Sequence, residues 1–153
     1  MTKRSTATKN NVFHTFVTLG PIGYLPYAPG TYGSALACLL LYFLPSVFAH
    51  PLFVFIFIVV TLIVLNNLAF EGKDPRYIII DEVAGMFVTM AGHNITLFSL
   101  LAGFVLFRFF DIKKPYPIKR VETLRQGYGI VGDDVVAGVF ANIIIIIGER
   151  ILT

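Results

Sequence analysis

Charged residues are scarce in this chain. Of its 153 residues only 14% are charged, against about 25% in an average globular domain. Hydrophobic residues make up 56%, and the mean hydropathy is +0.78. A soluble domain of this size leaves much of its surface in water and cannot bury so much apolar surface. The composition therefore favours a membrane protein, and it excludes intrinsic disorder, which requires low hydrophobicity and high net charge.

Cysteine and tryptophan are nearly missing as well. Cys38 is the sole cysteine, which excludes an internal disulfide and a cysteine-cluster metal site. There is no Trp, and 12 basic against 9 acidic residues leave a net charge of only +3. Without a basic, aromatic stripe the sequence does not predict nucleic-acid binding. We expect its 15 Phe and 7 Tyr to pack against lipid instead.

Five apolar segments predict helices, because an open sheet edge cannot lie in lipid whereas a helix satisfies its own backbone. They cover residues 33–49, 52–70, 83–91, 95–110 and 135–147. Segments 83–91 and 95–110 either form a re-entrant hairpin or span separately, since about 20 residues are needed to cross a bilayer. The expected fold is all-α, a multi-helix integral membrane bundle. It forms a single domain over residues 1–153, with residues 1–11 as a polar, flexible tail.

Charge collects on one side of such a bundle. If the helices alternate in direction, residues 1–32, 71–82 and 111–134 share one side, together with Arg108 at a helix end. Every Lys and Arg except Arg150, and every acidic residue except Glu149, then lies there. The positive-inside rule makes that side cytoplasmic. The sequence thus predicts a polar site on the cytoplasmic face.

Five carboxylates on that side form the candidate site. Asp81-Glu82 and Asp133-Asp134 are expected at helix starts, where the helix dipole favours negative charge; plain capping is the alternative for any single Asp. Asp111 follows an apolar helix, so it needs a cation: Arg108, Lys114 or a metal ion. No Cys or His lies among the carboxylates. A hard cation, Mg²⁺ before Ca²⁺ or Zn²⁺, therefore suits this group best.

Basic side chains and glycines beside the carboxylates indicate a phosphate. The basic residues are Lys113, Lys114, Lys119, Arg120 and Arg125, and the glycine-rich stretch is 127–132. Carboxylates that hold Mg²⁺ beside such groups recur where phosphate is bound, although attraction to anionic lipid heads explains a single lysine equally well. In segment 28–34, Thr31 or Ser34 could cap a helix or donate to a phosphate oxygen.

Four sequence blocks carry a family resemblance. They are APGTYGS at 28–34, KDPRYIIIDEVAGM at 73–86, FRFFDIKKPYPIKR at 107–120 and GYGIVGDDVVAG at 127–138. With these blocks in this order, the sequence closely resembles the phosphatidylglycerophosphatase A family from about Val12 onward. The resemblance implies a multi-pass bacterial inner-membrane lipid phosphatase that uses Mg²⁺. Its substrate would be phosphatidylglycerophosphate, and its products phosphatidylglycerol and phosphate, a step of phospholipid biosynthesis.

The resemblance also implies roles for individual residues. It points to an acidic centre that holds the metal and carries out catalysis: Asp81, Glu82, Asp111, Asp133 and Asp134. Lys114, with Lys113 or Arg120 as helpers, would stabilise charge on the phosphate, and Thr31 and Ser34 match polar positions of the first block. Glu82 is either the general base or a further ligand, and a covalent aspartyl-phosphate competes with attack by water.

Two positions depart from the family pattern, and two other functions compete with it. Gln126 replaces a usual glycine and Glu122 a usual aspartate, but neither removes a predicted ligand. A phosphotransferase acting on CDP-linked alcohols would need an Asp-Gly-x₂-Ala-Arg signature, which is missing. A transporter would place its acidic residues at mid-membrane depth rather than at helix ends.

Overall fold

The computed structural model describes residues 12–68, 75–125 and 127–152. The predicted flexible tail over residues 1–11, the charged residues of 71–74 and Gln126 lie outside this part. Within the described ranges every regular element is a helix and none is a strand, which confirms the all-α prediction.

The described residues form the following helices in chain order. After a helical segment over residues 12–18 come η1 (Ile22–Tyr24), α2 (Pro29–Phe43), η2 (Ser46–Ala49), α3 (Pro51–Asn67), α4 (Ile80–Met90), α5 (Leu97–Lys113), α6 (Ile118–Val121) and α7 (Gly127–Leu152).

Local sequence sets several helix limits. Pro29 and Pro51 occupy the first turns of α2 and α3, where the missing N–H leaves no hydrogen bond unmade. Pro45 follows Leu44, the C-terminal cap of α2. At the start of α5, the Thr96 hydroxyl accepts from the Ser99 N–H at 3.1 Å and the Ser99 hydroxyl accepts from the Thr96 N–H at 2.9 Å. This reciprocal capping satisfies two N–H groups that the helix itself leaves free.

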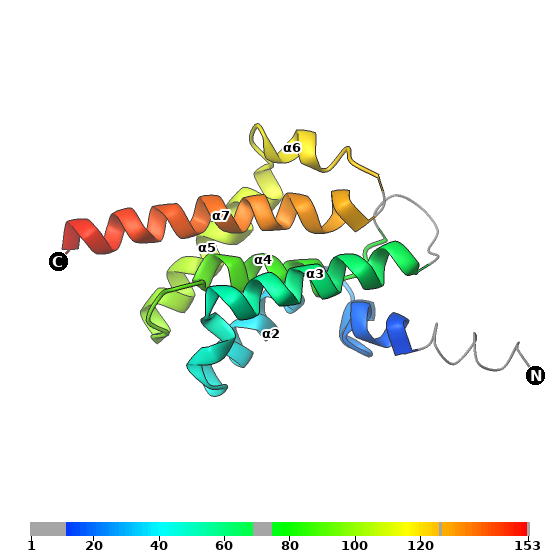
Figure 1. Ribbon diagram of the computed structural model, residues 1–153, viewed down its shortest axis with the longest axis horizontal. Helices are drawn as coiled ribbons and strands as arrows, with labels where there is room; N and C mark the ends of the chain where they lie inside the picture. Colours follow the sequence, from blue (N-terminus) through cyan, green and yellow to red (C-terminus); the bar gives the residue numbers. More distant parts are fainter. Residues whose placement is uncertain (1–11, 69–74, 126, 153) are drawn as a thin grey trace, which may run out of the picture.

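The five longer helices alternate in direction (Figure 1). The starts of α2 and α4 meet where Gly30 contacts Glu82, and the end of α3 meets the start of α7 at Gly127. Farther along α7, the Asn142 amide donates to the Val88 carbonyl near the end of α4 over 3.1 Å. Helices α2, α4 and α7 therefore run one way, and α3 and α5 the other. The end at which α2, α4 and α7 begin is called the site end below.

Helix α4 lies at the centre of the bundle. It packs against α2, α3, α5 and α7, and all its side chains from Val83 to Met90 are buried. A Cβ atom added to Gly138 of α7 would overlap the Gly85 carbonyl of α4, and one added to Gly85 would lie 2.8 Å from the Asp134 carbonyl. These glycines allow the two backbones to touch, and the contact places Asp134 beside the start of α4.

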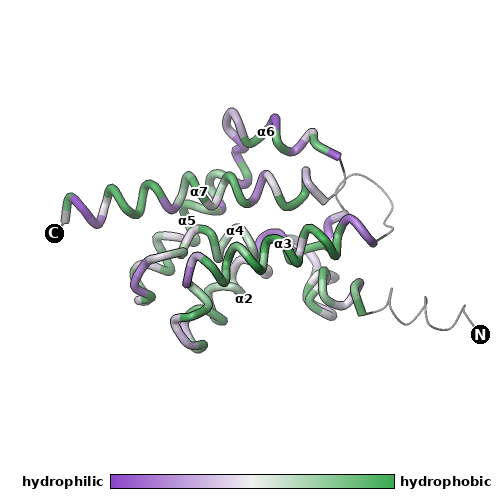
Figure 2. The backbone as a smooth tube through the Cα atoms, viewed as in Figure 1, coloured by the Kyte–Doolittle hydropathy of each residue, from purple (hydrophilic) through white to green (hydrophobic). Residues whose placement is uncertain are grey.

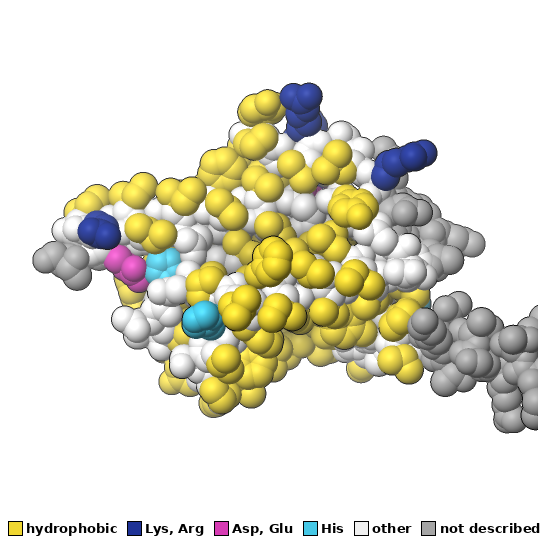
Figure 3. Space-filling view, viewed as in Figure 1, with side chains coloured by type: hydrophobic (Ala, Val, Ile, Leu, Met, Phe, Trp, Pro, Cys, Tyr) yellow, Lys and Arg dark blue, Asp and Glu magenta, His cyan; other side chains and the backbone are white. Residues whose placement is uncertain are grey.

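The outer surface of the bundle is apolar. Large hydrophobic side chains are exposed on α2, α3, α5 and α7, among them Phe43, Phe55, Phe98 and Ile147. They cover much of the face in Figure 3, and Figure 2 shows α3 as hydrophobic along most of its length. Helix α7 is long and apolar enough to cross a membrane, and α3 is apolar but shorter. A bundle that crosses the membrane several times therefore remains a prediction, with segments 83–91 and 95–110 either spanning separately or re-entrant.

The helix limits differ from the predicted segments most at α7. Helices α2 to α5 shift by a few residues, and α4 and α5 form an antiparallel hairpin. Helix α7 begins at Gly127 rather than at residue 135, so Asp133 and Asp134 lie two turns inside it, and their predicted place at a helix start is wrong. The glycine-rich stretch is helical, and its glycines pack closely against neighbouring segments: a Cβ on Gly129 would lie 2.6 Å from the Leu124 carbonyl. Such packing outweighs the low helix propensity of glycine.

Candidate active site

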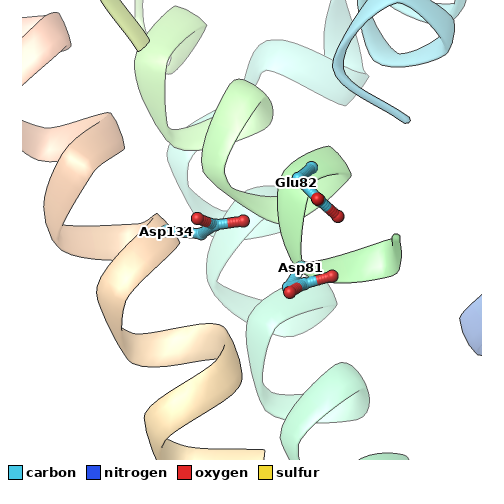
Figure 4. A group of neighbouring side chains, drawn as sticks. All are labelled: Asp81, Glu82 and Asp134. Atoms are coloured by element: carbon cyan, nitrogen blue, oxygen red, sulfur yellow. The ribbon is translucent and has the colours of Figure 1, made fainter. Parts of the chain in front are cut away.

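Three carboxylates from two helices meet at the site end. Asp81 and Glu82 lie in the first turn of α4, and Asp134 lies on α7. Each offers one carboxylate oxygen within 4.8 Å of the others. Asp81 and Asp134 are 6% and 3% exposed, and Figure 4 shows Asp134 directed from α7 toward the α4 turn that carries the other two. We call Asp81, Glu82 and Asp134 the carboxylate group.

Glu82 is enclosed by the start of α2. A Cβ on Gly30 would overlap Glu82 Oε1, and Glu82 Oε2 is buried without a hydrogen-bond partner among the described residues. Glu82 forms a hydrogen bond with Asp81, and the charge of Asp111 acts on its carboxylate. The ionised group therefore gains from a nearby cation.

Asp111 lies next to the carboxylate group and is paired with an arginine. Its carboxylate forms an ion pair with Arg108 Nη1, one helical turn earlier in α5. Its charge acts on both Glu82 and Asp134, so it faces the same small space. The predicted need for a cation beside this helix-end carboxylate is met by Arg108.

Asp133 points elsewhere, toward Lys114. The Lys114 ammonium lies 2.6 Å from Asp133 Oδ2 and 3.0 Å from Glu122 Oε1. Asp133 Oδ1 accepts the backbone N–H of Asp134 at 3.0 Å. Burial alone would lower the pKa of Lys114, but the hydrogen bonds to Asp133 and Glu122 raise it above its ordinary value. Lys114 is thus a permanent cation that ties the segment after α5 to α7, and it stands beside Asp133 rather than within the carboxylate group.

The other predicted phosphate contacts are more dispersed. The Ser34 hydroxyl is buried and donates to the Gly30 carbonyl at 2.8 Å, so its proton is already used within α2. Thr31 is half-buried in the first turn of α2. Lys113 and Arg120 are exposed on either side of the turn between α5 and α6. Their roles in phosphate binding remain predictions.

The carboxylate group has the donor set of a divalent-metal site. Carboxylate oxygens are the ligands that Mg²⁺ prefers, and the described part of the chain places no Cys or His beside them. The partnerless Glu82 Oε2 is a buried acceptor of the kind that a cation would satisfy. The residues present therefore fit a hard cation.

The sequence predicts Arg108 as a counter-ion of Asp111, but it does not predict that Arg108 also lies near Glu82 or that Gly30 belongs to the site. Arg108 was considered only as a counter-ion, yet Gly30, Asp111 and Glu82 all lie near its guanidinium. The sequence predicts a turn at Gly30, whereas in the structure Gly30 lies in the first turn of α2 and allows this helix to approach Glu82. The spacing of three between Arg108 and Asp111 on one helix was the available signal. Nothing in the sequence indicated the contact between Gly30 and Glu82.

Comparison with known proteins agrees with the resemblance. The family model described as Phosphatidylglycerophosphatase A matches residues 15–149. A "Phosphatidylglycerophosphatase A" of Haemophilus influenzae is 34% identical over 154 residues, covering 90% of this chain and 94% of the relative. One of Escherichia coli is 33% identical over 149 residues, covering 92% and 86%. A "Putative phosphatidylinositol-3-phosphatase" of Bacteroides thetaiotaomicron is 31% identical over 143 residues, covering 85% and 89%. No solved structure matches the chain.

Proposed function

The chain belongs to the phosphatidylglycerophosphatase A family, and from this premise we propose that it hydrolyses phosphatidylglycerophosphate to phosphatidylglycerol and phosphate with the help of Mg²⁺. Family membership makes it a phosphoric monoester hydrolase. The observation that carries the proposed chemistry is the carboxylate group, three acidic side chains within 4.8 Å at one end of an otherwise apolar bundle.

The proposed setting is a bacterial inner membrane, crossed several times, with the site end on the cytoplasmic side. The exposed apolar side chains of α2, α3, α5 and α7 support burial in lipid, since a large exposed apolar surface is costly in water. The basic residues support the orientation: Arg150 lies at the far end, whereas Lys113, Lys119, Arg120 and Arg125 lie at the site end.

Asp81, Glu82 and Asp134 would hold the Mg²⁺. When bound, Mg²⁺ supplies a Lewis acid for the phosphate oxygens and lowers the pKa of a water molecule. Glu82 is then either a third ligand or the base that takes a proton from the attacking water. Its enclosure by Gly30 favours the ligand role, because the enclosed oxygen has little room for water.

The other charged side chains of the site would orient the carboxylate group and the substrate. Arg108 compensates Asp111, whose charge faces Glu82 and Asp134. Lys114 holds Asp133, and through the Asp133 carboxylate it fixes the backbone N–H of Asp134. Each of the two cations therefore limits the movement of a carboxylate beside the reacting phosphate, and Lys113 or Arg120 can meet the phosphate from the solvent side.

The relative named for phosphatidylinositol-3-phosphate gives a second candidate substrate. Purified protein in detergent should be assayed for phosphate release from phosphatidylglycerophosphate, phosphatidylinositol 3-phosphate and phosphatidic acid, first with EDTA and then with excess Mg²⁺. We expect release from phosphatidylglycerophosphate to be fastest, to stop in EDTA and to return with Mg²⁺. Faster release from phosphatidylinositol 3-phosphate would replace the proposed substrate, and full activity in EDTA would overturn the metal.

A further inference from the structure

Exposed basic side chains lie on and beside the segment between α5 and α7. Lys113, Lys119, Arg120 and Arg125 are all exposed, and the acidic residue among them, Glu122, is paired with Lys114. Figure 3 shows Lys and Arg side chains standing out from the surface around α6. We call these four side chains the basic surface. It presents positive charge that no carboxylate of its own segment cancels.

Amphipathic and apolar side chains lie between those basic groups. Tyr116 is 76% exposed and Leu124 is 55% exposed, while Ile112 and Tyr128 project at the two ends of the segment. Tyrosine beside Lys and Arg is typical of the membrane–water interface, where the ring lies at the depth of the lipid headgroups. A surface that only faced water would gain nothing from these exposed side chains.

The segment is held firmly on the bundle. Ile118 of α6 is fully buried, and α6 packs against α7. Lys114 links it to Asp133 on the neighbouring part of α7 and to Glu122 after α6. The basic surface therefore lies at the same level along α7 as Asp133 and the adjacent Asp134.

We propose that the basic surface lies on the anionic headgroups of the leaflet at the site end. The occupant is an anionic lipid surface, because charge complementarity and the interfacial side chains coincide on one segment. Docking there fixes the depth of the carboxylate group at the level of lipid phosphates, where a lipid phosphomonoester has to be reached. The proposal rests on the membrane setting of the proposed function and adds which lipids the segment selects.

The chain has no Trp, so a single introduced Trp gives a clean probe. Tyr116→Trp places it within the basic surface, and Phe55→Trp places a control on the exposed face of α3. Each variant is reconstituted in phosphatidylcholine membranes that contain a fixed fraction of phosphatidylglycerol. Brominated acyl chains, which quench Trp fluorescence, are carried either by the phosphatidylglycerol or by an equal fraction of the phosphatidylcholine.

We expect the Trp at position 116 to be quenched at least about twofold more by brominated phosphatidylglycerol, since one basic group near an anionic surface changes lipid preference by up to about fivefold. The Trp at position 55 should show no preference. Adding Lys119→Gln and Arg125→Gln, which halves the basic surface, should lower the preference at 116 while detergent activity and quenching at 55 persist.

The other outcomes separate the proposal from the proposed function. Equal quenching of the position 116 probe by both lipids would overturn recognition of anionic headgroups. Absence of quenching at 116 with strong quenching at 55 would overturn membrane contact of this surface, and would favour a protein partner. Absence of quenching at both positions would overturn the membrane setting itself, whereas loss of phosphate release alone would leave the lipid contact intact.

Discussion

Acidic residues at the two ends of the bundle lie in different surroundings. At the far end, Glu149 is half-exposed, and its carboxylate lies 3.0 Å from Nδ1 of His93. At the site end, Asp81, Glu82 and Asp134 share one small space below the surface. A carboxylate beside its own partner at the surface needs nothing further, whereas carboxylates gathered in an enclosed space repel one another unless a cation joins them. Helix α7 therefore carries a structural contact at its far end, at Glu149, and part of a candidate binding site at the site end, at Asp134.

The sharpest test of the comparison changes one carboxylate at each end of α7. Asp134→Asn should lower kcat for phosphate release by more than about 100-fold, the upper range for a group that merely supports a metal ligand. Glu149→Gln should stay within about twofold of wild type. Both are measured by phosphate release at saturating Mg²⁺. If Asp134→Asn and Glu149→Gln lowered kcat equally, the acidic residues at the two ends would not differ in function.

The contact between α2 and α4 should be nearly as sensitive. In Gly30→Ala the new methyl group meets Glu82 Oε1 and lies 3.2 Å from Arg108 Nη1, so both flexible side chains must move. We expect roughly a tenfold or greater loss of kcat, by analogy with loss of an outer-shell contact. Gly148→Ala is the control, because nothing lies within 4 Å of its new Cβ. If both variants were equally active, the Glu82 carboxylate would not need its observed position.

Substitution of Lys114 tests whether a cation at the site end stabilises the fold. Lys114→Gln removes the charged hydrogen bonds to Asp133 and Glu122 and should cost about 2–3 kcal/mol of stability, followed by thermal unfolding in detergent. In the double variant with Asp133→Asn the loss should be smaller than the sum of the two single losses, because the buried charge is removed as well. Strict additivity would show that the pair does not stabilise the fold.

A substitution at the far end should have the smallest effect on stability and activity. Glu149→Gln removes the charge of a half-exposed side chain beside the buried His93 imidazole, and such surface contacts contribute at most about 1 kcal/mol. We expect a small drop in melting temperature and unchanged kcat. A kcat loss comparable to that of Asp134→Asn would mean that the two ends are coupled.

Much of the fold was predictable because apolar segments and charges are strongly sorted along the chain. The alternation of helices and the place of Asp81-Glu82 in a first helical turn follow from that sorting. The N-terminal extension of α7 did not follow, because the close approach of Gly127 to Leu65 of α3 and of Gly129 to the Leu124 carbonyl is a tertiary contact that the sequence does not show. Propensity describes isolated segments and cannot include such contacts.

The candidate site was predictable in its residue types but not in its grouping. The sequence shows five carboxylates, and only the fold separates Asp133, which faces Lys114, from Asp134, which faces α4. Adjacent residues of a helix point about 100° apart, so the direction of each depends on helix packing. The same holds for Gly30, whose contact with Glu82 spans two helices far apart in the sequence.

Cation binding by the carboxylate group is the central claim, and a Mn²⁺ titration tests it most directly. Binding of Mn²⁺ to the detergent-purified protein can be followed by electron paramagnetic resonance and by competition with Mg²⁺, independently of activity. We predict saturable binding to wild type and to Glu149→Gln, displaced by Mg²⁺ and weakened at least about tenfold in Asp81→Asn and Asp134→Asn. Unchanged Mn²⁺ affinity in both aspartate variants would contradict the account.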